Sequence, residues 1–406
     1  MSAATAATAA TAAAEVGTLR LATAGSVDDG KSTLVGRLLH DSKSVLADQL
    51  ESISRTGTPD LALLTDGLRA EREQGITIDV AHRYFATPRR RFILADTPGH
   101  VQYTRNMVTG ASTAELTIIL VNARNGVVEQ TRRHAAIAAL LRVPHVVLAV
   151  NKMDLVGYDE SAFTAIAAQF DALAPELGIP RVTAVPVSAL AGDNVVEPSA
   201  RMDWYGGPTV LEHLETVEVT AESPDAPARF PVQYVIRHDG TRSYAGQLVS
   251  GTLRVGDAVT VHPSGRTSTV TALDVLGAAV DEVPAGASLT VRLADELDVA
   301  RGDLIAPGER APTVTRDLRG AVCHLADRPL VVGQRVLVRH TTRTVRAVVR
   351  SLGPAERLTA NDLGEVVLRT AEPVVVDDYA AIRRTGAFLL VDPVDGMTLT
   401  AGMAAC

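Results

Sequence analysis

The hydrophobic positions in the first half of the chain form short runs separated by amphipathic stretches. The runs LRLATA, RFILAD, LTIILVNA, HVVLAVN and VTAVPVSA have the length and apolar character of parallel strands covered on both faces. Between them, TRRHAAIAALLR and SAFTAIAAQFDALAPEL repeat their apolar residues at helical spacing. The alternation predicts a doubly wound, mostly parallel α/β sheet over residues 16–217, with ligand loops at the carboxyl ends of its strands.

The pattern changes after EVTAESPDAPARFP, a linker rich in Pro, Ala and acidic residues around residues 218–231. The segments PVQYVIRHDG, AGQLVSGTLRVGDAVTVHPSG and SLTVRLAD alternate apolar and polar residues between Gly or Pro turns, as short antiparallel strands do. A second break, APGERAPTVT, precedes a last segment of the same texture. We therefore predict two antiparallel β-barrel domains, over residues 226–312 and 315–406.

Composition narrows the class of protein. Hydrophobic residues make up 46% of the 406 positions and the formal net charge is -8, so no global basic field attracts nucleic acid or an anionic membrane. No apolar run approaches the roughly 18 residues of a membrane-spanning helix. The two cysteines, Cys323 and Cys406, form no C-x-x-C pair, which favours a reducing compartment. We expect a soluble, cytoplasmic protein with no membrane or nucleic-acid partner, beginning with a disordered Ala/Thr tail over residues 1–15.

The stretch GSVDDGKST fits the phosphate-binding pattern G-x-x-x-x-G-K-[ST] and lies between an expected strand and an expected helix. We expect its backbone N–H groups to hold phosphates, Lys31 to bridge the β- and γ-phosphates as a catalytic group, and the Ser32 hydroxyl to ligate Mg²⁺. Lysine is rare in this chain, occurring only as Lys31, Lys43 and Lys152, which adds weight to its presence here. The predicted loop residues are Gly25, Ser26, Val27, Asp28, Asp29, Gly30, Lys31, Ser32 and Thr33.

Four further residues are expected around the γ-phosphate. In ADTPGH, Asp96 acts on Mg²⁺ through water and the Gly99 amide approaches the γ-phosphate. Thr77, in GITID, is the candidate switch residue that closes over Mg²⁺ through its hydroxyl. His100 follows Gly99 and is the candidate that orients the attacking water.

Two later motifs are expected to determine which nucleotide base is bound. In AVNKMD, the Asp154 carboxylate can accept two hydrogen bonds from guanine, whereas adenine offers no such pair of donors. Asn151 would tie the base loop together and Lys152 would lie along the base. The stretch SAL, comprising Ser188, Ala189 and Leu190, would present the Ala189 amide to guanine O6. With these motifs in this order, the sequence predicts a P-loop GTPase domain that binds GTP and Mg²⁺.

The spaced set GSVDDGKS, EREQGITID, DTPGH and NKMD, followed by two barrels, resembles the translation-factor class of GTPases, as in elongation factor Tu. Within that class the chain looks most similar to the large subunits of bacterial heterodimeric sulfate adenylyltransferases. LALLTDGLRAEREQGITIDVAHRYF, QYTRNMVTGAST, QTRRH and LRTAEPVVVDDYAAIRRTGAFLLVD carry that resemblance. It implies GTP hydrolysis that drives ATP and sulfate to adenosine 5′-phosphosulfate and diphosphate on a small catalytic partner subunit, which binds both substrates.

The chain agrees with that division of labour. It has no S-G-G-x-D-S pyrophosphate loop, and no lysine after Lys152 that could serve a second P-loop. We therefore expect no fused adenylylsulfate kinase domain. Two other functions stay open: an elongation-factor-like GTPase that delivers aminoacyl-tRNA, and a GTP-binding scaffold without turnover. Asp29, where translation factors of this class usually have His, leans against the first, and His100 against the second.

Two features have no assigned role. Asp28 matches an acidic position shared with translation factors, where a carboxylate would help to hold a metal-linked or monovalent-cation site near the phosphates. Asp29 is either a functional residue or a solvent-facing one. Residues 316–350 hold eight arginines against two aspartates. On strands, alternation would place one set of these arginines on a common face, facing an acidic partner, an RNA backbone or solvent.

Overall fold

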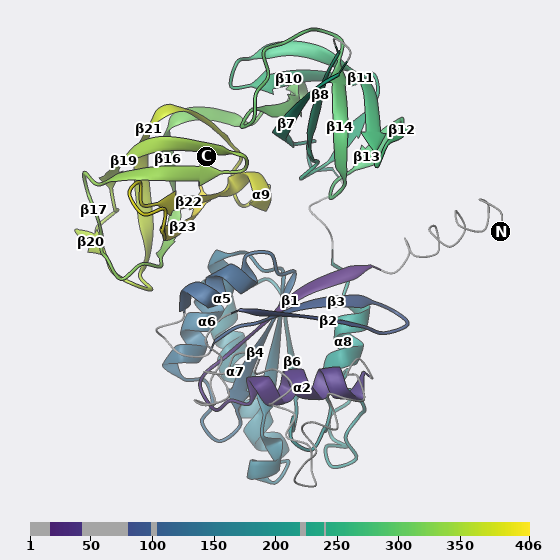
Figure 1. The fold of residues 1–406 in the computed structure, drawn as a ribbon. Helices are drawn as coiled ribbons and strands as arrows, with labels where there is room; N and C mark the ends of the chain where they lie inside the picture. Colours follow the sequence, from purple (N-terminus) through teal and green to yellow (C-terminus); the bar gives the residue numbers. More distant parts are fainter. Residues whose placement is uncertain (1–16, 43–79, 99–103, 220–224, 239–240) are drawn as a thin grey trace, which may run out of the picture. The chain divides into compact units, whose positions relative to one another are not determined.

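The computed structural model describes residues 17–42, 80–98, 104–219, 225–238 and 241–406, in two compact units, Met1–Val219 and Thr220–Cys406 (Figure 1). The expected Ala/Thr tail lies outside the described residues. Within the described ranges, no helix is long and apolar enough to cross a membrane.

The first unit is built on a six-stranded sheet in the order β2-β3-β1-β4-β5-β6. All neighbouring strands are parallel except β2, which runs antiparallel to β3. Edge strand β2 was not predicted from the sequence, because only one of its residues, Phe85, is buried. The strands are β1 (Thr18–Gly25), β2 (Ala81–Ala86), β3 (Arg91–Asp96), β4 (Leu116–Asn122), β5 (His145–Asn151) and β6 (Val182–Pro186).

Helices cover both faces of this sheet (Figure 1). On one face, Leu34 and Leu38 of α2 and Leu214 of α8 share a core cluster with Leu21 and Ile118 of the strands. Helix α7 begins where the Asp159 carboxylate accepts hydrogen bonds from two backbone amides, and it ends before a left-handed glycine. The helices are α2 (Lys31–Asp41), α5 (Thr104–Ala111), α6 (Glu129–Leu140), the 3₁₀ turn η3 (Met153–Val156), α7 (Glu160–Leu177) and α8 (Val210–Thr216).

The second unit begins with a barrel in which β10, β15, β7, β8, β14 and β11 form a ring, closed by the β10–β11 pairing, with β12 added at β11. Phe230, Val259 and Val291 lie in its core. Strands β9 and β13 form a separate pair. The elements are β7 (Phe230–His238), β8 (Thr241–Gln247), β9 (Thr252–Arg254), β10 (Ala258–His262), β11 (Arg266–Val275), β12 (Ala278–Val280), β13 (Glu282–Pro284), β14 (Ser288–Leu293), β15 (Leu304–Pro307) and the 3₁₀ turn η4 (Gly308–Arg310).

A closed six-stranded barrel of order β16-β21-β19-β18-β22-β23 completes the unit. At Gly402 a Cβ would lie 2.2 Å from the Phe388 ring, so only glycine fits between these neighbouring strands. The elements are β16 (Thr313–His324), β17 (Leu330–Val331), β18 (Arg335–His340), β19 (Arg343–Ser351), β20 (Arg357–Leu358), β21 (Leu363–Val376), α9 (Arg383–Gly386), β22 (Ala387–Val391) and β23 (Thr398–Ala404). The predicted fold class, an α/β P-loop domain followed by two antiparallel barrels, is confirmed.

A buried ion pair joins the two barrels. The Arg229 guanidinium, immediately before β7, binds both carboxylate oxygens of Asp377 at 2.9 Å, just after β21. Asp377 also accepts from Thr385 Oγ1 at 2.6 Å, and Arg229 donates to the Arg310 carbonyl at 2.6 Å. The two charged groups are therefore satisfied by a network, which is the condition under which buried charge is tolerated.

Candidate nucleotide-binding site

The predicted phosphate loop lies between β1, which ends at Gly25, and α2, which begins at Lys31. Gly30 has φ +89°, and a Cβ there would lie 2.5 Å from the Asn151 side-chain nitrogen. Glycine is therefore required at this position for two independent reasons. Asp28 also adopts a left-handed conformation, with φ +65°, which aspartate tolerates better than most residues.

Asp29 braces this loop from inside. Its side chain is 4% exposed, and its carboxylate accepts a hydrogen bond of 2.6 Å from the Ser26 backbone N–H. The Asp29 N–H in turn donates to the Ser26 carbonyl at 3.3 Å. Burial raises the pKa of Asp29, partly offset by the hydrogen bonds from Ser26 and by the charge of Lys31. The solvent-facing alternative for Asp29 is therefore wrong: this carboxylate holds the shape of the loop.

Lys31 lies buried within the curve of the loop. Its ammonium donates to the carbonyls of Gly25 at 2.8 Å and of Ser26 at 3.0 Å. Burial lowers the pKa of Lys31, and the negative charges of Asp96 and Asp29 oppose this shift. Val27 at the tip of the loop is 43% exposed, and Ser32 and Thr33 are half-buried in the first turn of α2.

Asp96 ends β3 directly beside β1. Its carboxylate is almost fully buried and accepts a 2.9 Å hydrogen bond from the Thr23 hydroxyl, in register with it on the neighbouring parallel strand. The Thr97 hydroxyl donates to the Thr23 carbonyl. Thr23 and Thr97 therefore orient the strand end that carries Asp96. Neither threonine was predicted from the sequence, since threonines inside apolar strands carry no distinctive signal.

Three predicted residues around the γ-phosphate, Thr77, Gly99 and His100, lie outside the described residues. Their roles stay predictions.

Asn151 connects the phosphate loop to the base-reading loops. Its side-chain nitrogen donates to the Asp29 carbonyl at 2.7 Å, and its side-chain oxygen accepts from the Ala189 N–H at 2.9 Å. We had expected that Ala189 amide to face guanine O6. Because it donates here to Asn151, its contact with the base stays a prediction.

The residues that would read the base are held by side-chain hydrogen bonds. The fully buried Ser188 hydroxyl donates to Asp154 Oδ1 at 2.7 Å and so orients this carboxylate. Lys152 has φ +64°, and its side-chain Cε lies 4.0 Å from where a Gly30 Cβ would stand. The Lys152 stem thus runs over the phosphate loop.

Arg37 of α2 fixes the loop that contains Leu190. Its guanidinium donates to the carbonyls of Ala189 at 3.2 Å and of Leu190 at 2.6 Å. The Leu190 side chain is left 73% exposed at the edge of the site. Arg37 could not be predicted as a site residue, because a polar residue on a helix face is ordinarily solvated.

The donor set fits a phosphate-bound magnesium ion better than a protein-only metal site. Among the described residues, no group of three or more His, Cys, Asp or Glu side chains could hold a metal. Mg²⁺ commonly takes one or two protein ligands together with substrate phosphates, for which Ser32 and Asp96 are suited. The buried Ser26 hydroxyl has no hydrogen-bond partner among the described residues, and a bound oxyanion would supply one.

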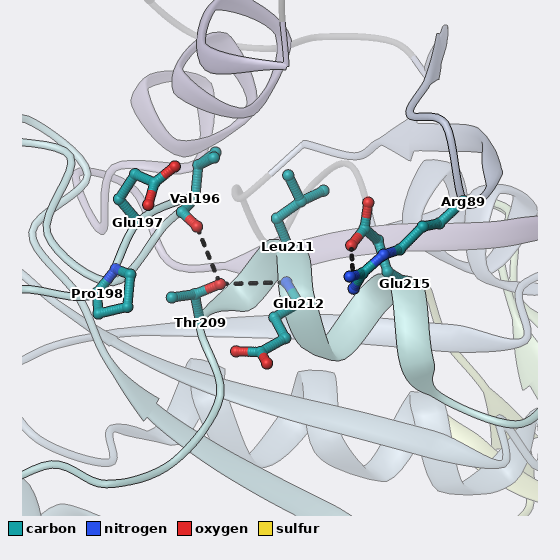
Figure 2. A pocket seen from close by; sticks show the side chains of 8 residues that line it. All are labelled: Arg89, Val196, Glu197, Pro198, Thr209, Leu211, Glu212 and Glu215. Atoms are coloured by element: carbon teal, nitrogen blue, oxygen red, sulfur yellow. Dashed lines mark hydrogen bonds and ion pairs between the residues drawn. The ribbon is translucent and has the colours of Figure 1, made fainter.

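A pocket of about 330 Å³ lies in the same unit, lined by residues that include Arg89, Val196 and Thr209 (Figure 2). The Thr209 hydroxyl caps α8 by accepting from the Glu212 N–H and donates to the Val196 carbonyl, while Arg89 forms an ion pair with Glu215. These interactions serve the helix, and no residue proposed for the nucleotide lines this pocket.

Family models of GTPase domains match most of the chain. The family model of the elongation factor Tu GTP binding domain matches residues 17–259, and that of the GTP-eEF1A C-terminal domain-like family matches residues 318–405. A solved structure of sup35 complexed with GDP is similar at 22% identity and a TM-score of 0.44, covering 96% of this chain and 94% of its own.

Curated relatives are much closer in sequence. The Bifunctional enzyme CysN/CysC of Mycobacterium tuberculosis (strain ATCC 25618 / H37Rv) is 52% identical over 95% of this chain and 67% of its own length. Sulfate adenylyltransferase subunit 1 of Aeromonas hydrophila and that of Shewanella oneidensis are each 47% identical, over 95% of this chain and 85% of theirs. The chain belongs to the sulfate adenylyltransferase subunit 1 family, within the translation-factor class of GTPases.

Proposed function

We propose that this chain hydrolyses GTP to drive sulfate adenylyltransfer on a partner subunit. The observation that carries the proposal is the match at 46–47% identity, across 95% of the chain, to relatives named sulfate adenylyltransferase subunit 1. The reaction makes adenosine 5′-phosphosulfate and diphosphate from ATP and sulfate. A small catalytic subunit in the cytoplasm binds these two substrates and carries out the transfer.

Each predicted site residue has a proposed part in GTP hydrolysis. Lys31 stabilises charge on the transferring phosphoryl group, and Asp154 selects guanine. Ser32, Thr77 and Asp96 would hold Mg²⁺, which would supply positive charge to the phosphate oxygens. His100 orients the attacking water.

Coupling to the partner follows from a difference in affinity. Forming a phosphate–sulfate anhydride is strongly uphill, so hydrolysis must move the complex between states that bind substrates and products differently. Thr77 is the proposed switch residue, since its contact with Mg²⁺ depends on the γ-phosphate.

The test is co-purification with the small subunit, followed by assays of GTP hydrolysis and adenosine 5′-phosphosulfate formation. We expect ATP and sulfate together to stimulate hydrolysis, and omission of GTP to reduce product formation. Hydrolysis that ignores both substrates, with aminoacyl-tRNA bound only in the GTP state, would instead establish the elongation-factor-like alternative.

A substitution tests turnover against a binding-only scaffold. His100→Ala should lower kcat for GTP about 10²–10⁴-fold with little change in GTP affinity, because it removes the group that orients water. His82→Ala, at an exposed position of β2, is the control and should leave kcat unchanged. Equal kcat in both variants would remove His100 from the mechanism.

A further inference from the structure

The last barrel carries a set of arginines that the nucleotide site does not use. Arg335 and Arg339 lie on β18, and Arg346 and Arg350 lie on β19; all four side chains are exposed. The residues that alternate with them, including Val338 and Val345, fill the barrel core. We call these four arginines the arginine face.

Strand register brings these charges together. Arg335 pairs with Val348 and Arg339 with Thr344, which places Arg346 diagonally between the two β18 arginines. Diagonal neighbours in an antiparallel pair lie about 7–8 Å apart, within reach of one another's long side chains. The arginine face is therefore a compact patch of positive charge on a chain whose net charge is -8.

Several arginines elsewhere in the same unit have acidic partners. Arg254 pairs with Glu282 at 2.9 Å on the first barrel. Arg369 of β21, the strand next to β19, pairs with Asp317 of β16 at 2.7 Å. Across the described ranges, no ion pair and no side-chain hydrogen bond involves any arginine of the face. A solvated surface usually intersperses both signs of charge. Four arginines without a counter-charge therefore indicate that a binding partner supplies the negative charge.

The neighbours of the arginine face indicate what kind of molecule supplies that charge. Half-buried Leu337 lies opposite Arg346, half-buried Val348 opposite Arg335, and Leu389, 38% exposed, opposite Arg339. Arginine mixed with apolar side chains is typical of protein interfaces, whereas single-stranded nucleic acid is usually held by aromatic rings that stack on bases, and this patch has none.

We infer that the arginine face is the docking surface for an acidic patch of the catalytic subunit. This inference rests on the proposed function, since it assigns the place where that partner binds. Guanidinium groups would pair with Asp and Glu carboxylates in forked geometry, and Leu337 and Val348 would be covered between them. The charges would also accelerate association at low ionic strength.

The experiment compares two charge-reversed double variants of the full-length chain. R335E/R346E changes the arginine face, and R237E/R266E makes the same change in net charge at two exposed positions of the first barrel. Each is co-expressed with the small sulfate adenylyltransferase subunit of the same organism. Affinity is measured by titration at about 50 and 300 mM salt, alongside GTP affinity as a check on folding.

We expect R335E/R346E to weaken partner affinity at least ~100-fold at low salt and to flatten its salt dependence, with GTP affinity unchanged. The control should stay within about threefold of the unmodified chain. Restored affinity when acidic residues of the partner are reversed to arginine would support direct pairing.

Three other outcomes overturn the inference in distinguishable ways. If the unmodified chain does not bind the small subunit, the proposed function itself fails. If it binds and R335E/R346E binds equally well, or both double variants lose binding alike, the partner docks elsewhere. If R335E/R346E loses binding to total tRNA but keeps its affinity for the small subunit, the arginine face is a nucleic-acid surface.

Discussion

The two units of the molecule bury polar groups in different places, and the buried groups hold different parts of the structure. In the first unit, Asp29, Asn151 and Ser188 are buried where parallel strands end, and each fixes a loop. In the second, Arg229 and Asp377 are buried where one barrel meets the other, and they fix two domains. A change in the first set should therefore alter ligand binding, whereas a change in the second should alter stability.

The largest effect on ligand binding is expected at Asp154. In Asp154→Asn, one acceptor oxygen of the base-reading carboxylate becomes a donor, so preference for GTP over xanthosine triphosphate should fall about 10⁴-fold. Competition between the two nucleotides measures this ratio. Asp171→Asn, at an exposed position of α7, serves as the control. Undiminished selectivity in Asp154→Asn would contradict its base-reading role.

The junction between the barrels is tested by Arg229→Met, which leaves Asp377 buried without its cation. Loss of one partner from such a pair costs about 3–5 kcal/mol of unfolding free energy. Hydrogen exchange of the β21 amides in the full chain reports this local stability. GTP affinity should not change.

The matching exposed pair supplies the control for this prediction. Arg254→Met breaks the pair with Glu282, whose side chains are 55% and 53% exposed, and should cost less than about 1 kcal/mol. Equal losses of hydrogen-exchange protection in the two variants would mean that the buried Arg229–Asp377 pair stabilises the protein no more than the exposed pair does.

The brace inside the phosphate loop gives a smaller effect on binding. Asp29→Ala removes a hydrogen bond to a charged acceptor, typically about 1.5–3 kcal/mol, so GTP affinity should fall about 10–100-fold. Asp171→Ala, which removes the same charge at an exposed position of α7, should retain affinity within about threefold. A calorimetric titration that found the opposite order would reverse the assignment.

His134 extends the comparison, because it is a buried polar residue of the first unit whose side chain bonds to Gln130 within the same helix, α6. Burial lowers the pKa of His134 to about 3, aided by the nearby charges of Lys31 and Arg133. The unfolded chain takes up a proton near pH 6.5 while the folded chain does not. Stability should therefore fall as pH decreases below about 6.5, by up to about 1.4 kcal/mol per pH unit.

His134→Gln should flatten that dependence between pH 6.5 and 5, because the new side chain does not titrate. Denaturant unfolding at several pH values measures it, and His82→Gln is the exposed control. A slope unchanged in His134→Gln would show that other groups govern acid stability.

Most of the fold was predictable because continuous apolar runs have few alternatives. The runs around Leu21, Leu94, Ile118 and Leu148 are all buried strands of one sheet. Edge strand β2 was not predictable in this way, since a strand covered on few positions carries a weak hydrophobic signal.

The candidate site also contains residues that could be predicted from the sequence and residues that could not. The spacing of motifs indicated Lys31 and Asp154, because a fixed loop conformation needs a fixed number of residues. Arg37 and Thr23 reach their partners across 152 and 73 positions of sequence, and a distance of that kind is set by the fold alone. The same holds for Asp29, whose burial depends on how the loop turns.

The two hydrogen bonds of Asn151 have one further consequence. The same amide restrains the carbonyl of Asp29 and the N–H of Ala189. Ordering the phosphate loop therefore also orders the base loop, and the two loops share one loss of conformational entropy. An intact guanine nucleotide gains from both loops for that single loss. Guanosine and inorganic diphosphate, offered as separate molecules, each meet the whole of it, and we expect their binding free energies to sum to much less than that of the joined ligand.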